Sequence, residues 1–389
     1  MEDMTSRQVI NSFASIDRTM VRGKIFCDDG GFRQGTVILE GGVVVGVDFA
    51  LANLGKVGPD KYIIPGLVDI HLHGAAGVDG SKADVDGLKK IDEYERNSGI
   101  AAYCMATMTL PYNDIESMCD KIYGLLKSGE VKGLQGLYFE GPYINKDKCG
   151  AQNAKNACVP TDESVKKLEK LLEDFPCIKY VVLAPELSGA VELIKKLTAR
   201  GVKVSIGHTM ANYEEAIAGF KAGATQVTHL YNAMPIFYHR EPGVIGAAFD
   251  EAAFVELITD GYHISPSAVR STFAMYGEDR VVLVSDSMMA TGLEDGKYTL
   301  GDQEVFVSNR EATIRDNGRT ILAGSASNLY ECMVSAIKMG VPVEKAIKAA
   351  TINPARSLGI DGRYGSIAKG KAPGFIVADE TWKIEKVIF

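Results

Sequence analysis

Eight short apolar segments recur along the chain between residues 64 and 285, and longer polar segments separate them. The apolar segments are 64–70, 100–106, 134–139, 178–183, 202–207, 226–230, 254–259 and 281–285. Between them, residues 164–175 and 212–223 have the apolar spacing of amphipathic helices. A repeated strand–helix unit predicts a parallel sheet covered by helices, and eight strands are the number that closes a (β/α)8 barrel. We therefore predict an α/β protein with a TIM-like barrel.

The two ends of the chain have a different pattern from the middle. Residues 18–60 and 363–389 contain short strand-like segments interrupted by glycine and proline. We predict a small β-sandwich domain built from both termini, residues 1–61 and 363–389, attached to a barrel of residues 62–362. Residues 296–323 break the strand–helix rhythm and predict a β-hairpin before the last helices.

The composition argues against several classes of protein. The formal net charge is −8 and no long basic run occurs, so nucleic acid is not an expected partner. No apolar segment reaches the about 20 residues that span a bilayer, and the first residues lack the apolar centre of a signal peptide. The seven cysteines include no Cys-x-x-Cys pair, which argues against disulfides and against a cysteine zinc site. We expect a cytoplasmic protein with no membrane partner.

Metal-ligand residue types follow five of the eight apolar segments. They are His71 and His73, Glu140, His208, His229 and Asp286. Alternate residues of a strand point to the same side, so both histidines of the first pair face one point. Each residue alone also fits a hydrogen-bonded core histidine or a surface acid. Because strand ends of a barrel converge, the set predicts a divalent metal site, with zinc first and iron or manganese as alternatives.

Asp286 closes the eighth segment, within VVLVSDS. An acid at this position can take a proton from an attacking water and return it to the leaving group. The alternative interpretation is a helix N-cap, for which aspartate is a favoured residue. The agreement among the strand ends favours the catalytic interpretation.

Arg240 lies in YHREPG, after the sixth segment. Its planar, permanently charged guanidinium suits a phosphate or a carboxylate. A surface ion pair with Glu241 explains the same residue equally well. The chain has no P-loop and no dinucleotide-binding glycine motif, so nucleotide binding has little support.

The motifs together resemble a known family. PGLVDIHLHG, YFEGPYIN, SIGHT, THLYNAM, HREPGVIGAAFD, DGYH, LVSDSM, LAGSASNL and TINPARSLG are similar to those of N-acetylglucosamine-6-phosphate deacetylases, which belong to the amidohydrolase superfamily. The resemblance implies hydrolysis of the acetamide of an N-acetylhexosamine 6-phosphate, which gives the amino sugar phosphate and acetate. It places the chain in amino-sugar catabolism.

The resemblance also implies roles for single residues. Glu140, His208 and His229 hold the principal metal. His71 and His73 allow a second metal that Glu140 bridges, with Asp286 nearby, so one or two metals are expected. Asp286 is the general base and then the general acid. The implied substrate contacts are Ala151, Gln152, Asn232, Ala233, Arg240, Asp260, His263, Leu322, Ala323 and Gly324.

The chain departs from the family pattern at two positions. Gln152 stands where many members have the histidine that polarises the amide carbonyl. Glutamine can donate a hydrogen bond but cannot be cationic. Ser265 stands where a second histidine is frequent, which affects the expected phosphate pocket. Members are commonly homodimers, and the resemblance implies that Arg240 reaches the neighbouring subunit's site.

Three other functions stay open from the sequence. The galacto epimer, N-acetylgalactosamine 6-phosphate, needs the same chemistry, and no residue reports the hydroxyl that differs. A cyclic amidase of the dihydroorotase or hydantoinase type usually bridges two metals with a carboxylated lysine after the fourth strand, where this chain has VVLAPE. A sugar-phosphate-binding barrel without catalysis usually loses ligands, and none is missing here.

Overall fold

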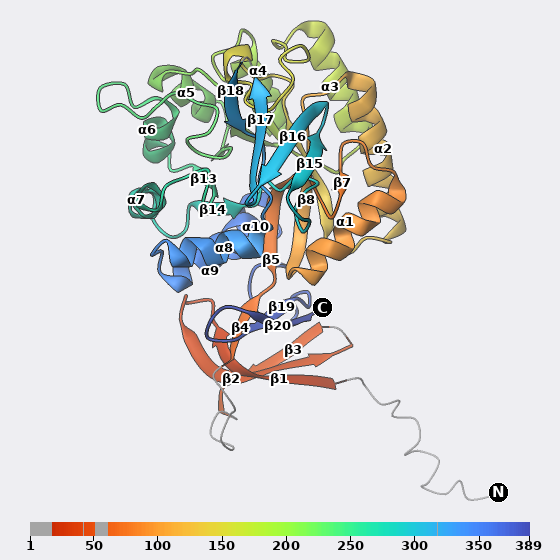
Figure 1. The fold of residues 1–389 in the computed structure, drawn as a ribbon, viewed down its shortest axis with the longest axis vertical. Helices are drawn as coiled ribbons and strands as arrows, with labels where there is room; N and C mark the ends of the chain where they lie inside the picture. The colour runs from red at the N-terminus through yellow and green to blue at the C-terminus, as the bar shows by residue number, and fades with distance from the viewer. Residues whose placement is uncertain (1–17, 42, 51–60, 317) are drawn as a thin grey trace, which may run out of the picture. The chain divides into compact units, whose positions relative to one another are not determined.

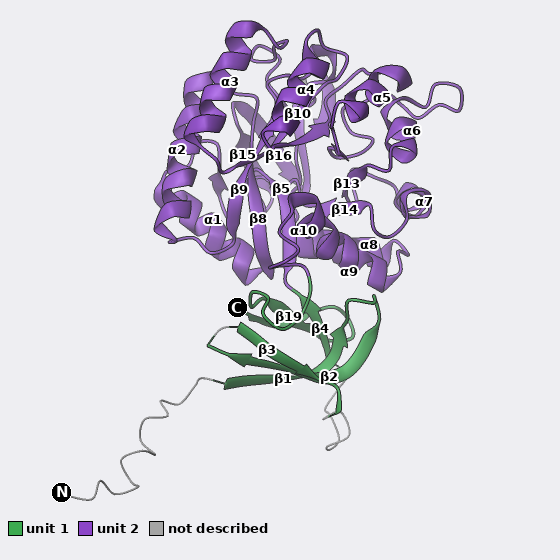
Figure 2. Cartoon of the chain, turned by 180° about the vertical axis from the view of Figure 1, so that it is seen from behind, with its two compact units in different colours: residues 1–65, 366–389 green, residues 66–365 purple. Residues whose placement is uncertain are grey.

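The computed structural model of the protein describes residues 18–41, 43–50, 61–316 and 318–389. The chain divides into two compact units, one of residues 1–65 with 366–389 and one of residues 66–365 (Figure 2). The sequence predicts the boundaries at 61/62 and 362/363. Residues 1–17, on which the prediction about export rests, lie outside the described residues.

The larger unit contains a sheet of eight parallel strands in the order β14-β13-β12-β11-β10-β9-β8-β5 (Figure 1). Its strands are β5 (Leu67–Leu72), β8 (Ile100–Thr107), β9 (Leu134–Glu140), β10 (Ile178–Leu183), β11 (Lys203–Ile206), β12 (Gln226–Val227), β13 (Phe254–Ile258) and β14 (Val281–Val284). The two outer strands meet where Asp286 N–H donates to the His71 carbonyl at 3.0 Å. The predicted TIM-like barrel is confirmed.

The strands are apolar throughout because both of their faces are buried. All eight residues of β8 are buried, and so are all six of β5. A strand that packs against helices outside and against the barrel interior inside gains from apolar residues at every position. Continuous apolar segments, rather than alternating ones, therefore mark these strands in the sequence.

The first predicted strand, 64–70, is wrong as a single element. The structure divides it into β4 (Tyr62–Pro65), which pairs with β1 and β19, and β5, which begins at Leu67 in the barrel. Pro65 has no N–H and cannot donate to a sheet ladder, so the chain changes sheets there. The sixth predicted strand is also shorter than expected, because the chain turns at His229, where φ is 30°.

Helices follow the strands and form the outer layer of the barrel (Figure 1). They are α1 (Val85–Asn97), α2 (Tyr112–Ser128), α3 (Asp162–Asp174), α4 (Ala190–Ala199), α5 (Tyr213–Lys221), α6 (Gly243–Asp250), α7 (Pro266–Tyr276), α8 (Leu329–Lys338), α9 (Val343–Ala350) and α10 (Ile352–Leu358). Reciprocal capping boxes fix the starts of α5, through Asn212 and Glu215, and of α8, through Asn328 and Glu331. In the part of the chain that the structure describes, no helix has both the length and the apolar character needed to cross a membrane.

The excursion at 296–323 is a four-stranded antiparallel sheet, so the predicted single hairpin is wrong. Its strands are β15 (Gly296–Leu300), β16 (Gln303–Ser308), β17 (Glu311–Asp316) and β18 (Arg319–Leu322). Asn309 and Arg310 both have positive φ, 51° and 69°, as a two-residue type I′ turn requires. Of these two residues, only Asn309 is of a type that indicates such a turn, which explains why the sequence does not show the extra strands.

A short antiparallel pair, β6 (Gly74–Ala75) and β7 (Val78–Asp79), follows β5.

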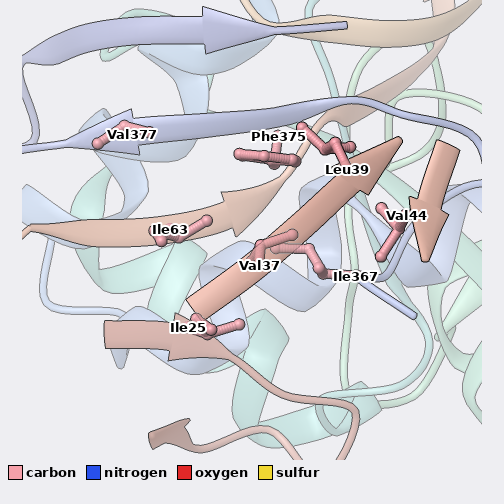
Figure 3. Close-up of a cluster of buried hydrophobic side chains, with 8 residues drawn as sticks. All are labelled: Ile25, Val37, Leu39, Val44, Ile63, Ile367, Phe375 and Val377. Atoms are coloured by element: carbon pink, nitrogen blue, oxygen red, sulfur yellow. The ribbon is translucent and has the colours of Figure 1, made fainter. Parts of the chain in front are cut away.

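The smaller unit is one six-stranded sheet in the order β20-β19-β4-β1-β2-β3, built from both ends of the chain. Besides β4 its strands are β1 (Arg18–Phe26), β2 (Phe32–Glu40), β3 (Val43–Asp48), β19 (Phe375–Ala378) and β20 (Ile384–Ile388). Apolar side chains of these strands and Ile367, which precedes β19, gather in one buried cluster (Figure 3), which consists of Ile25, Val37, Leu39, Val44, Ile63, Ile367, Phe375 and Val377. Burial of this cluster joins the N-terminal and C-terminal segments in one core.

Candidate active site

The six predicted metal-ligand residues all lie at the carboxyl ends of barrel strands. His71 is the next-to-last residue of β5 and His73 directly follows the strand. Glu140 ends β9, and His208, His229 and Asp286 lie two residues beyond β11, β12 and β14. All six side chains are buried. The structure therefore brings together residues that are up to 215 positions apart, from 71 to 286, in one place.

Three of these residues have a backbone conformation that L-amino acids rarely adopt. The φ angles are 48° at His208, 30° at His229 and 48° at Asp286. Non-glycine residues in the left-handed region cost free energy and persist where the surrounding structure holds them. Such residues cluster at functional sites, and here each one turns its side chain at the end of a strand.

Glu140, His208 and His229 form the first of two groups whose ligand atoms converge. Oε1 of Glu140 lies 2.9 Å from Nε2 of His208 and 3.0 Å from Nε2 of His229, and the two nitrogens are 3.1 Å apart. Nδ1 of His208 lies 2.8 Å from the Lys148 carbonyl oxygen, which only a protonated Nδ1 can satisfy. Its Nε2 is therefore available as a ligand.

His71, His73 and Asp286 form the second group. The Nε2 atoms of the two histidines are 3.4 Å apart, and Nε2 of His73 lies 3.2 Å from Oδ1 of Asp286. Oε2 of Glu140 also lies 3.2 Å from Nε2 of His73. Glu140 thus presents one carboxylate oxygen to each group, which is the arrangement of a bridging carboxylate.

The donor set fits divalent cations. Four imidazole nitrogens and two carboxylates, without thiolate, suit zinc and related transition metals. Burial alone would raise the pKa of Glu140, but the charge of His71 and hydrogen bonds from His208 and His229 hold that pKa well below its usual range. Burial would lower the pKa of His73, but the carboxylates of Asp286 and Glu140 raise it to about 9. The carboxylates therefore attract positive charge to this point.

Glu256 contacts the metal-ligand histidines from behind and is not among the site residues predicted from the sequence. It lies in the middle of β13 with no exposed surface, and its Oε2 is 3.0 Å from Nδ1 of His71. Its Oε1 accepts a hydrogen bond from the Tyr138 hydroxyl at 2.7 Å, and its Oε2 accepts one from the His229 N–H at 3.2 Å. A carboxylate bonded to the remote nitrogen fixes the tautomer and orientation of a ligand histidine. The only signal in the sequence is a glutamate inside an apolar strand.

Gln152 has a fixed amide orientation beside Glu140. Its Oε1 accepts a hydrogen bond from Thr109 N–H at 2.6 Å, and its Nε2 donates to Oε2 of Glu140 at 2.6 Å. The main-chain donor requires the amide oxygen on one side, so the NH2 group must face the carboxylate. Thr109 was not identified from the sequence.

A cavity of about 370 Å³ opens over the two groups. Its lining includes predicted substrate-binding residues, namely Ala151, Gln152, Asn232, Ala233, His263, Leu322 and Gly324. Asp260 lies behind His263, with Oδ2 2.8 Å from the Nδ1 of that ring. Ala323 is fully buried between two lining residues. Leu300, Ile321 and Leu322, from the four-stranded sheet, contribute an apolar wall.

Arg240 stands apart from this cavity. It is not among the described residues that line the cavity, and it is exposed. Its guanidinium lies 5.2 Å from the ring centroid of Tyr238 and also donates to the Tyr238 hydroxyl. Among the described residues it makes no ion pair with Glu241, the alternative that the sequence left open. Exposed apolar side chains, Ile236 at 89% and Phe237 at 46%, lie in the same loop.

Comparison with known proteins places the chain in a family. The amidohydrolase family model matches residues 62–389. The N-acetylglucosamine-6-phosphate deacetylase of Vibrio furnissii is 35% identical over 335 residues, which covers 83% of this chain and 80% of the relative. The N-acetylgalactosamine-6-phosphate deacetylase of Escherichia coli O157:H7 is 32% identical over 331 residues, 84% of this chain and 86% of the relative.

Solved structures with a similar fold are also N-acetylglucosamine-6-phosphate deacetylases. A mutant N-acetyl-D-glucosamine-6-phosphate deacetylase from Mycobacterium smegmatis, in complex with N-acetyl-D-glucosamine-6-phosphate, has a TM-score of 0.86 at 28% identity and covers 95% of this chain and 97% of its own. The enzyme from Thermotoga maritima has a TM-score of 0.84 at 29% identity, over 94% and 96% of the two chains. The chain therefore belongs to the amidohydrolase family and, within it, to the N-acetylglucosamine-6-phosphate deacetylases.

Proposed function

We propose that the protein hydrolyses the N-acetyl group of N-acetyl-D-glucosamine 6-phosphate, giving D-glucosamine 6-phosphate and acetate, in amino-sugar catabolism. The single observation that carries this is that six buried metal-ligand side chains lie together at the strand ends, five of them in the lining of one cavity, in a chain of this family. A linear amide must be hydrolysed by water, which needs a proton acceptor, a donor for the amine and stabilisation of the developing oxyanion.

The residues that would hold the metal are Glu140, His208 and His229 for one cation and His71, His73 and Asp286 for a second, with Glu140 between them. A divalent metal bound there would supply a Lewis acid and lower the pKa of a coordinated water to about 7 in the best-studied zinc sites. Imidazole and carboxylate ligands favour zinc, and iron and manganese are the alternatives. We propose one or two cations per subunit.

Asp286 is the proposed general base and then general acid. Its carboxylate lines the cavity. Burial would raise its pKa, but the hydrogen bond from His73 and the charges of both histidines lower that pKa below 3.8. Asp286 is thus ionised near neutrality and can accept a proton from the attacking water. A cation held by His71 and His73 in place of their protons would favour the ionised carboxylate in the same way. When the C–N bond breaks, it returns the proton to the leaving amine, and the acyl carbon keeps the water oxygen as acetate.

Gln152 is proposed to orient the acetamide. One hydrogen of its amide is used by Glu140, and the other is directed to Sδ of Met108 at 3.7 Å, a weak acceptor that a substrate carbonyl oxygen in the cavity can replace. Because Thr109 fixes the amide orientation, this hydrogen is placed in advance. A neutral donor supplies less stabilisation of an oxyanion than a cationic histidine, so a cation held by Glu140, His208 and His229 would have to supply more of it.

We propose a cytoplasmic homodimer. The support is the exposed apolar loop with Ile236 and Phe237, which lies next to Arg240 and outside the cavity of its own chain. Burial of this loop against a second copy would remove apolar surface from water and bring Arg240 near the second copy's cavity.

A single assay tests the proposed function. Protein stripped with a chelator and reconstituted with zinc, iron or manganese is incubated with N-acetylglucosamine 6-phosphate, its galacto epimer, the unphosphorylated sugar and a hydantoin. We expect metal-dependent acetate release that is fastest from the gluco sugar phosphate. Faster release from the galacto epimer would reassign the substrate. Faster ring opening of the hydantoin, or tight sugar-phosphate binding without turnover, would contradict the proposal.

A further inference from the structure

We propose that Lys148 is the cation with which this chain holds the phosphate group of its substrate. The inference rests on the proposed deacetylase function and adds a residue that neither the motifs nor the comparisons assign. Three observations support it: the charges that line the cavity, the way in which Lys148 is fixed, and the donors that its side chain has left.

The cavity has one permanently cationic side chain among the described residues that line it. Lys148 is the only lysine or arginine in that lining. Glu140 and Asp286 place carboxylates at the metal end, and Asp147 adds a third. A phosphate carries about −1.5 to −2 charges at neutral pH and binds where charged donors are provided. Among the described lining residues, Lys148 is the permanently charged group with the required sign, and His263 is a further lining side chain that can carry a positive charge.

Lys148 is fixed at both of its ends. It is the last residue of the 3-10 helix η3 (Lys146–Lys148), whose N-cap is Asn145. Its carbonyl oxygen lies 2.8 Å from Nδ1 of the ligand histidine His208. Its Nζ donates to the Met234 carbonyl oxygen at 3.0 Å. The side chain is therefore half-buried and spans from one strand-end loop to the next.

This position puts the ammonium group beside main-chain residues of the cavity wall. Met234 follows Asn232 and Ala233, and both of these line the cavity. An ammonium has three N–H donors, and the Met234 carbonyl uses one. Among the described residues Nζ makes no ion pair, including with the neighbouring Asp147, which is exposed. Two donors are left for phosphate oxygens.

A purely structural interpretation of the same contacts exists. Lys148 would then serve only to tie the η3 loop to the loop after β12. Both interpretations predict that loss of the side chain reduces activity on the sugar phosphate. They differ in the selectivity for phosphate, because a structural defect lowers the turnover of phosphorylated and unphosphorylated sugars alike.

The test compares Lys148→Met, Lys148→Arg and the matched control Lys146→Met in the metal-loaded full chain. Lys146 is exposed, lies in the same 3-10 helix and does not line the cavity. The readout is the ratio of kcat/KM for N-acetylglucosamine 6-phosphate to that for N-acetylglucosamine. Loss of a charge-assisted contact should lower this ratio about 10- to 100-fold in Lys148→Met. Lys148→Arg should recover part of it, and Lys146→Met should match the wild type.

An unchanged ratio in Lys148→Met, whatever the absolute rate, would overturn the inference and leave a structural role. The proposed function fails separately if the wild type releases acetate from neither sugar. In that event, equilibrium dialysis of inorganic phosphate against metal-loaded wild type and Lys148→Met still decides the question. Weaker phosphate binding by the variant supports the inference, and equal binding overturns it. Metal content per chain confirms that the His208 site is intact.

Discussion

Oε2 of Glu256 lies 3.0 Å from Nδ1 of His71, although 185 residues separate the two along the chain. The carboxylate is fully buried and accepts further hydrogen bonds from Tyr138 and from the His229 main chain. One side chain thus orients a histidine of one ligand group and touches the backbone of a histidine of the other. The two ligand groups are therefore connected twice. The hydrogen bonds of Glu256 connect them, and so does the carboxylate of Glu140.

Replacement of Glu256 by glutamine should weaken metal binding at His71. The neutral amide makes a poorer acceptor for the Nδ1 proton and reduces the basicity of Nε2. Loss of such an orienting partner costs about 10- to 100-fold in metal affinity or activity. Metal content per chain and acetate release measure both effects. Glu251→Gln, an exposed acid near the start of the same strand, is the control; equal metal content in the two variants would contradict the assignment.

Replacement of Asp286 by asparagine should reduce turnover strongly and leave the principal metal bound. Removal of a positioned proton acceptor costs about 10²- to 10⁴-fold in rate. Glu140, His208 and His229 form their group without Asp286, so at least one metal per chain should remain. The measurements are kcat and metal content, with the exposed Asp302→Asn as control. Near-normal kcat would exclude Asp286 as the base.

Replacement of Gln152 by alanine should lower kcat more than it raises KM. The change removes the donor at 2.6 Å from Oε2 of Glu140 and the donor proposed for the substrate carbonyl. A lost hydrogen bond to a charged group costs about 1.5–3 kcal/mol, or roughly 10- to 100-fold in rate. Steady-state kinetics separate the two constants. Asn153→Ala, the adjacent residue outside the lining, should behave as the wild type.

The Asp260–His263 pair should give a pH-dependent contribution to stability. Burial would lower the pKa of His263, but the hydrogen bond and charge of Asp260 raise it above 6.5. Because the pKa of His263 is higher in the folded than in the unfolded state, the pair contributes its full stabilisation below a pH of about 6.5. This contribution is lost as the pH rises through the pKa of the folded state. Asp260→Asn should therefore lower Tm more at pH 6 than at pH 9.

The control for this experiment is Asp250→Asn, in which an exposed acid that bonds to Tyr213 is changed. Its effect on Tm should be the same at the two pH values, because tyrosine stays protonated at both. A constant difference between wild type and Asp260→Asn across this range would show that the pair does not titrate as the structure indicates.

Removal of the metal should destabilise the barrel reversibly. Without a cation, two buried carboxylates and four imidazole rings remain close together, and they then need protons to balance their charge. A ligand present at 100 times its Kd stabilises the folded state by about 2.7 kcal/mol, so Tm should fall on chelation and return with zinc. Equal Tm values for stripped and reconstituted protein, with metal content verified, would contradict the proposed sites.

Much of the fold and of the candidate site can be predicted from local sequence. The apolar segments mark the barrel strands because a strand buried on both faces needs apolar residues at every position, and this pattern lies within about eight residues. The candidate metal-ligand residues can be predicted from local sequence as well. Each one stands at the end of an apolar segment, and parallel strands in a barrel bring such ends together.

The tertiary structure decided what depends on contacts between distant segments. Glu256 is an ordinary glutamate in the sequence until β13 carries it behind His71. The direction of the Gln152 amide depends on Thr109, 43 residues earlier, and the Lys148 ammonium donates to the carbonyl oxygen of Met234, 86 residues later. The division of the first strand at Pro65 depends on pairing with β19 from the other end of the chain. Periodicity and motifs report what a residue's neighbours in sequence are, whereas hydrogen-bond partners of buried polar groups are set by which strands the fold places side by side.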